Sequence, residues 1–229
     1  MQIFFGEKMV NKALEEDQIH PSAYGSVPQR TAQDAVLKKV LSMDMIQVTK
    51  VTGAIFDCDA KGCYDRIITA LQTIFSRRLG IPKRTAQFFA VLWGICEHHV
   101  RTKNGVSQGC YVGTIGAMLY GIGQGNEADP AFWLSHLIVM FFVLDKITHG
   151  IQFKSPRDDI NHKSSGMGFV DDVTLGCTEN NSIETNEEIQ ERDDEKRIRV
   201  CNQITEMAQH WEKMLYADGG RLELNFFIG

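Results

Sequence analysis

The sequence has few of the features that mark secreted, membrane-spanning or disulfide-linked proteins. Its six cysteines include no CxxC pair and no regular spacing, which argues against a zinc ribbon and a disulfide framework and indicates an intracellular protein, in the nucleus or the cytoplasm. Residues 1–12 contain no apolar run long enough for a signal peptide. The longest apolar stretch, residues 131–144, is shorter than a membrane span and contains His136. It predicts a buried core helix and no membrane partner.

The composition also lacks the signs of disorder and of a strongly basic protein. Of 229 residues, 43% are hydrophobic and 23% charged, as in one globular domain, or one domain and part of a second. The net charge of −5 is unfavourable for a nucleic-acid enzyme, because phosphate contacts need Lys and Arg. Residues 179–196 carry eight acidic and two basic residues, so their net charge of −6 leaves the remainder at +1. We interpret this segment as a solvated acidic insert.

The hydrophobic pattern mixes helices and strands without strict alternation, which favours the α+β class. Helices are predicted over residues 4–16, 31–41, 66–79, 84–98, 130–146 and 192–217. Strands are predicted over residues 51–56, 167–170, 173–176 and 221–227. Thr31 is a candidate N-cap for the second helix. Residues 96–99 (CEHH) fall on a predicted helix, where four consecutive side chains cannot converge on one ion, so no zinc site is predicted there.

The first candidate functional segment is IFDCDAKGCYD, residues 55–65, which begins at the end of the predicted strand 51–56. A carboxylate at the end of a buried strand is costly unless a cation or hydrogen bonds compensate it. Mg²⁺ is the usual cation, since it is held by one or two carboxylates together with substrate phosphates. Ordinary loop chemistry or a helix cap is the alternative for this DxD pattern.

The second segment is GMGFVDDVTL, residues 166–175, in which Asp171 and Asp172 lie between two apolar β-type stretches. This pattern predicts a hairpin with the two acids at its tip. Like charges this close repel each other unless a metal neutralises them, whereas a purely structural type I′ turn prefers Asn-Gly or Asp-Gly. Two-metal phosphoryl transfer needs carboxylates from separate elements, and Asp59 and Asp171 would supply them.

Five segments in a fixed order resemble the reverse transcriptases, specifically those of non-LTR retrotransposons and group II introns, over about residues 20–224. YGSVPQRTAQDAVL is similar to the fingers signature of that family, and residues 56–67 resemble motif A. GIGQGNEADP resembles motif B, FVDD motif C, and WEKMLYADGGRLEL the stretch leading into motif D. In motif D, Asp218 stands where Thr or Ser is usual.

The resemblance implies roles for six residues. Asp59 precedes Asp65 by six positions, as in motif A, which makes Asp59 rather than Asp57 the implied metal ligand. With Asp171, and with Asp172 assisting, Asp59 is expected to bind two Mg²⁺, or Mn²⁺ in their place. For nucleotide binding, Tyr64 is expected under the sugar of the incoming nucleotide. The pair Gln124-Gly125 is expected to let the backbone approach the templating base pair.

The fold implied by the resemblance is a polymerase palm, an antiparallel sheet with helices packed on one face, plus partial fingers. Residues 1–50 would be partial fingers and residues 51–229 the palm with motifs A to D, with the thumb absent from a truncated chain. The implied activity is RNA-directed DNA polymerase. The partners would be an RNA or DNA template with its primer and deoxynucleoside triphosphates, with protein partners unknown.

Two alternatives belong to other classes. The first is a catalytically inactive, truncated retroelement fragment that at most binds nucleic acid. The second is a palm-type nucleotidyl cyclase, which should carry a GG[DE]EF-type turn. The sequence instead has Gln124-Gly125 and Asp171-Asp172, which argues against a cyclase.

Overall fold

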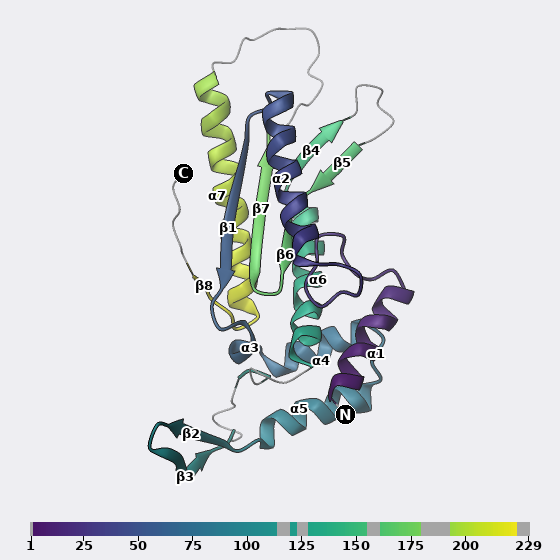
Figure 1. The fold of residues 1–229 in the computed structure, drawn as a ribbon, viewed down its shortest axis with the longest axis vertical. Coiled ribbons are helices and arrows are strands. Elements are labelled where there is room, and N and C mark those ends of the chain that lie inside the picture. Colours follow the sequence, from purple (N-terminus) through teal and green to yellow (C-terminus); the bar gives the residue numbers. More distant parts are fainter. Residues whose placement is uncertain (1, 114–119, 123–127, 155–160, 180–192, 224–229) are drawn as a thin grey trace.

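The computed structural model describes residues 2–113, 120–122, 128–154, 161–179 and 193–223 (Figure 1). These residues form seven helices and eight strands. The helices are α1 (Gln2–Glu15), α2 (Ala32–Thr49), α3 (Cys63–Arg66), α4 (Thr69–Arg78), α5 (Lys83–Ile95), α6 (Asp129–Ile147) and α7 (Asp193–Ala217). The strands are β1 (Gly53–Ala60), β2 (His98–Thr102), β3 (Gly105–Tyr111), β4 (Ile151–Lys154), β5 (Asn161–Ser164), β6 (Gly166–Phe169), β7 (Asp172–Thr178) and β8 (Leu222–Glu223).

The main sheet is antiparallel, with the strand order β6-β7-β1-β8. Two further hairpins, β2-β3 and β4-β5, each form a two-stranded sheet. Strand β1 pairs with β7 along its length, from Gly53 opposite Thr178 to Asp59 opposite Asp172. The mixed α and β content and the antiparallel sheet are as predicted from the sequence.

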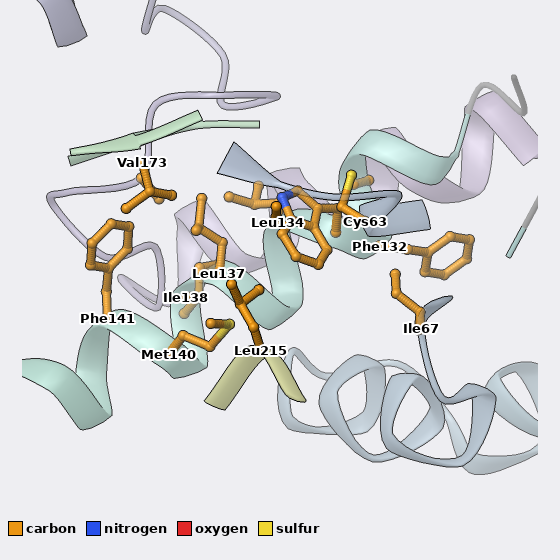
Figure 2. Packing of buried hydrophobic residues seen from close by; sticks show 14 of the residues in the cluster. Cys63, Ile67, Phe132, Leu134, Leu137, Ile138, Met140, Phe141, Val173 and Leu215 are labelled. Atoms are coloured by element: carbon orange, nitrogen blue, oxygen red, sulfur yellow. The ribbon is translucent and has the colours of Figure 1, made fainter. Parts of the chain in front are cut away.

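One face of the main sheet packs on the hydrophobic core. Because side chains alternate along a strand, Cys58, Ala60 and Val173 point to this face and are buried. Helix α7 contacts β1 and β7 there, and α6 contacts α7 (Figure 1). Figure 2 shows side chains of α6, β7 and α7 gathered in one cluster, among them Phe132, Leu137, Phe141, Val173 and Leu215.

Helix α6 is the predicted core helix. By length and composition alone it could span a membrane, but 61% of its most apolar window is buried inside the protein. Phe132, Trp133 and Phe141 are at most 1% exposed, and each lies in the core cluster. The apolar character of α6 is therefore explained by its central position among the other helices.

Helix α2 lies over the opposite face of the sheet, which the sequence did not indicate. Its N-terminus is as predicted: the Thr31 side chain accepts from the Asp34 backbone, and the Asp34 side chain accepts from the Thr31 backbone. The helix then continues to Thr49, where Ile46 packs against Gly53 of β1, a position without a side chain to block it. Helices consequently lie on both faces of the sheet rather than on one.

The helix predicted over residues 66–79 is interrupted. Its backbone is extended at Ile67, between the single turn of α3 and the start of α4. At this break the backbone bonds to distant segments: the Ile67 carbonyl accepts from Gly121, and the Ile68 N–H donates to the Asp218 carbonyl. These tertiary hydrogen bonds replace the helical ones that local propensity favours.

The helix predicted over residues 84–98 is wrong at its C-terminus. Helix α5 ends at Ile95, and His98 begins the β2-β3 hairpin, whose loop is Lys103-Asn104. The Asn104-Gly105 pair is a hairpin signal that could have located this element, and Gly105 has the positive φ of +122° that glycine tolerates. Residues 96–99 are therefore not consecutive positions on a helix.

The predicted β6-β7 hairpin exists, with its tip shifted by one residue. The loop is Val170-Asp171 rather than Asp171-Asp172, because Phe169 pairs with Asp172 as the last ladder position. Asp172 is thus the first residue of β7. The predicted final strand begins as β8, and its remaining residues, like most of the acidic insert, lie outside the described part of the chain.

Candidate active site

The register of β1 and β7 brings acidic side chains from separate elements together at one end of the sheet. Asp59 lies directly opposite Asp172, so both side chains point to the face that is turned away from α6 and α7. Asp57 shares this face because it precedes Asp59 by two residues, and it lies opposite Thr174. These carboxylates line a groove of about 440 Å³ between the sheet and α2.

Asp57 is bonded to two neighbouring side chains. The ammonium group of Lys39 in α2 donates to one carboxylate oxygen of Asp57 at 2.6 Å. The Thr174 hydroxyl donates to the other oxygen, also at 2.6 Å. Asp57 is therefore engaged in an ion pair that fastens α2 to the sheet. The choice of Asp59 over Asp57 as the metal ligand stays a prediction from the resemblance to motif A.

Asp171 is positioned by the hairpin loop beside the end of β1. Its carbonyl accepts from the backbone N–H of Ala60 at 3.2 Å, which extends the β1-β7 ladder past Asp59. Burial raises the pKa of the Cys63 thiol to about 12, and the charges of Asp171 and Asp59 both add to this rise. The hydrogen bond to Ala60 places Asp171 beside the residue that follows Asp59 in β1.

The carboxylates at this end of the sheet repel one another. The pKa of Asp172 is raised, first by burial and then by the negative charges of Asp171 and Asp57. A divalent cation among these groups would relieve the repulsion. Carboxylate oxygens are hard donors that suit Mg²⁺ or Mn²⁺, so the residues present fit the metal that the sequence predicts.

Tyr64 lies in the short helix that follows β1, half-buried against the core. The pKa of its phenol is raised, mainly by burial, with contributions from Cys63, Asp171 and Asp129. Its carbonyl accepts from Ile122 at 3.0 Å, which joins this turn to the segment before α6. Gln124 and Gly125 fall outside the described residues.

Sequence reasoning missed the contacts that hold the hairpin loop in place. Val170 has a φ of +58°, which is rare and strained for a β-branched residue. The Trp133 indole donates to the Val170 carbonyl at 2.6 Å, and Gly25 lies so close that a Cβ there would stand 2.4 Å from the Val170 nitrogen. No local sequence signal marks Trp133 or Gly25, since each contacts Val170 across a long sequence separation.

The loop that contains Gly25 is itself anchored to the sheet. The Tyr24 N–H donates to the Gly168 carbonyl at 2.9 Å, and the Gly168 N–H donates to the Ser22 carbonyl at 2.8 Å. These bonds add the loop to the edge strand β6 as a short parallel bridge. The segment resembling a fingers signature therefore contacts the hairpin that carries Asp171.

Comparison with known proteins gives structural matches only. No protein-family model matches the sequence, and no curated protein matches it. Among solved structures, telomerase of Candida albicans, bound to the TWJ fragment of telomeric RNA, matches with a TM-score of 0.54 and 10% identity over 95% of this chain. Apo telomerase of Candida tropicalis, truncated from the C-terminal domain, matches with a TM-score of 0.52 and 13% identity over 96% of this chain.

The chain has a reverse-transcriptase-like fold. A third structure, telomerase of Candida tropicalis with the same RNA fragment, matches with a TM-score of 0.52 and 14% identity over 96% of this chain. At such identities the likeness concerns the fold alone. The chain spans 31–38% of the length of these three telomerase chains. This chain therefore shares its fold with a part of each telomerase chain.

Proposed function

We propose that this chain is the catalytic centre of an RNA-directed DNA polymerase, which transfers nucleotides from deoxynucleoside triphosphates to a primer 3′-hydroxyl. The observation that carries the proposal is the position of Asp59 opposite Asp172, with Asp171 in the adjoining loop, on a reverse-transcriptase-like fold. Residues 51–229 would form the palm and residues 1–50 part of the fingers. The order of the motifs supports a non-LTR or group II type.

In this proposal Asp59 and Asp171 hold two Mg²⁺ ions, or Mn²⁺, with Asp172 completing the set. The ions would supply activation of the attacking hydroxyl and neutralisation of the leaving pyrophosphate. The protein positions the three carboxylates through the β1-β7 register and the Trp133 bond to the loop. Tyr64 would pack under the nucleotide sugar and disfavour a 2′-hydroxyl, while Gln124 and Gly125 would adjoin the templating base pair.

Binding of RNA is supported by the neighbours, two of which are telomerases in complex with the TWJ fragment of telomeric RNA. The groove between α2 and the acidic face offers Lys39, which is paired with Asp57. Phosphate contacts of a template-primer duplex would have to come from other basic side chains, and Arg101 and Lys103 are exposed candidates in the described residues.

The test is Mg²⁺-dependent extension of a DNA primer on an RNA template. Asp171→Asn should reduce the extension rate by at least about 100-fold, because it removes charge that acts on the transition state, while thermal unfolding shows an intact fold. Asp57→Asn is the matched comparison. This variant removes the charge of a carboxylate on the same face of the sheet, but one that is bonded to Lys39 and Thr174. The larger part of the extension rate should therefore survive.

The outcomes separate the proposal from its alternative. Extension that survives Asp171→Asn, or that falls equally in Asp57→Asn, would remove the two-metal assignment. If the wild-type chain binds an RNA–DNA duplex but extends no primer with Mg²⁺ or Mn²⁺, it is a non-catalytic nucleic-acid-binding fragment.

A further inference from the structure

A second group of metal-ligating side chains lies on the β2-β3 hairpin, away from the acidic face of the main sheet. Glu97, His99 and Cys110 each offer one ligand atom, and these atoms all lie within 4.8 Å of one another. The sequence places Glu97 and His99 close together but gives no reason to join them to Cys110. The hairpin does so, because His99 and Cys110 are directly paired across the two strands.

The backbone geometry, and not only the side-chain rotamers, produces this convergence. Directly paired residues of an antiparallel ladder have their side chains on the same face, about 4.5–5.5 Å apart at Cβ. The neighbouring pair, His98 and Tyr111, must then point to the other face, where their rings stack with centroids 5.1 Å apart. His98 and His99 therefore lie on opposite faces of the hairpin.

His99 is already oriented as a ligand. Its Nδ1 lies 3.2 Å from the Ser107 carbonyl, to which it can donate, and this leaves Nε2 directed toward Glu97 at 3.8 Å. Metal-bound histidines characteristically donate their second ring nitrogen to such an acceptor. Ser107 is held in turn, since its hydroxyl accepts from Val100 and donates to the Gly109 carbonyl.

We propose that the β2-β3 hairpin binds a zinc ion through Glu97, His99 and Cys110. A mixed oxygen, nitrogen and sulfur set suits Zn²⁺, whereas Mg²⁺ prefers oxygen ligands only. Tetrahedral zinc with bonds of about 2.0–2.3 Å separates its ligand atoms by about 3.5 Å. The 3.8 Å between His99 and Glu97 is close to this value. The three protein ligands leave the fourth position to water or to an exogenous ligand.

Such a crosslink would stabilise the hairpin, which buries few of its side chains. In β3 every residue except Ser107 is exposed, and in β2 every residue except His98 is exposed. A two-stranded sheet with so little burial is marginally stable in water. A zinc ion would join β2, β3 and the connection from α5, and the ordering of the hairpin would then depend on the metal.

Zinc binding requires the Cys110 thiolate and the neutral His99 imidazole. Formation of the zinc–sulfur bond releases the thiol proton to the buffer, with no change of oxidation state. Affinity should therefore fall as the pH is lowered.

The test is titration of the full chain with Zn²⁺ against a chromophoric chelator, with Mg²⁺ and a phosphine reductant present. We expect one zinc per chain. Cys110→Ser and His99→Ala should each weaken binding at least about tenfold, whereas His98→Ala, from the other face of the same hairpin, should leave it unchanged. Cys110 and His99 are exposed, so both ligand variants should fold. Unfolding curves would check this.

Two further measurements assign the ion to this site. Co²⁺ in place of Zn²⁺ should show thiolate-to-cobalt charge-transfer absorption that Cys110→Ser abolishes. Zinc should also protect Cys110 from alkylation while Cys201, the other exposed cysteine, stays reactive. Binding that is equal in the wild type and both ligand variants, or that Asp171→Asn abolishes instead, would overturn the proposal without touching the proposed polymerase function.

Discussion

At the scale of single residues, Asp218 is held by a buried side chain from a distant part of the chain. Reverse transcriptases usually have Thr or Ser at this place. Here the Asp218 carboxylate lies 3.0 Å from Nδ1 of His136, a histidine of α6 that is fully buried. The other ring nitrogen of His136 lies 2.8 Å from Oε1 of Gln72, whose amide nitrogen donates to Ser76 and Ser135. The network joins α4, α6 and the turn after α7.

Asp218→Thr, which introduces the residue usual in the reverse transcriptases that this segment resembles, should destabilise the protein by about 1–3 kcal/mol. It leaves a nitrogen of the buried His136 ring without its acceptor, and an unsatisfied buried polar group carries that cost. His136→Leu in the same chain should recover part of the loss, because the two changes then remove both members of the Asp218–His136 pair and leave only Oε1 of Gln72 without its partner. Denaturant unfolding of both single variants and the double variant measures the coupling energy. Additive losses would contradict the network.

At the scale of elements, the β6-β7 hairpin depends on a loop residue that other elements force into a strained conformation. Val170 adopts a positive φ, Trp133 of α6 bonds to its carbonyl, and Gly25 packs against its nitrogen. The hairpin in isolation would relax, since no local sequence preference favours valine in this conformation. The position of Asp171 is therefore set by α6 and by the loop before α2.

Gly25→Ala should destabilise the protein by about 1–3 kcal/mol and reduce primer extension further than the loss of stability explains. The added Cβ would stand 2.4 Å from the Val170 nitrogen, so the loop carrying Asp171 must shift. Gly94→Ala in α5 is the control, because a Cβ there meets nothing within 4 Å and alanine favours a helix by about 1 kcal/mol. Unfolding curves and extension rates measured on both variants check this pair. Equal effects would refute the close contact.

At the scale of the whole molecule, Lys38 links the stability of the fold to pH. Its side chain reaches from α2 to Ser22 at 3.4 Å and to the Gly166 carbonyl at 3.5 Å. Burial lowers its pKa from 10.5 to about 8, with Arg30 acting in the same direction and Asp145 against it. The folded state therefore holds the proton less tightly than the unfolded state. Its contribution to stability is greatest above pH 10.5, falls as the pH drops toward 8, and stays constant below.

Lys38→Met should raise the free energy of unfolding at pH 7 by about 1–3 kcal/mol, since it removes a charge that burial disfavours. The gain should shrink between pH 8 and 10.5 and disappear above that range, where wild-type Lys38 is neutral in both states. Urea unfolding of the two proteins across this pH range measures the difference. A gain that is independent of pH would mean that packing, and not the charge of Lys38, limits stability.

The sequence by itself determined features that depend on neighbouring residues. The Thr31 cap begins α2 as predicted, and the two apolar stretches around Asp171 and Asp172 predicted the β6-β7 hairpin. The largely apolar stretch of residues 131–144 predicted the core helix. Each of these follows from backbone geometry or local hydrogen bonding, which act over a few residues. The candidate acids Asp59, Asp171 and Asp172 were chosen because their segments resemble motifs A and C.

The tertiary structure alone decided which distant groups meet. The register of β1 on β7 put Asp59 opposite Asp172, and the fold of α2 gave Asp57 its partner Lys39. Tertiary hydrogen bonds at Ile67 and Ile68 broke a helix that local propensity favours. The β2-β3 pairing turned an unremarkable Glu97 and His99 into a candidate zinc site with Cys110. Strand register and long-range packing are set by the burial of whole elements, which no short stretch of sequence encodes.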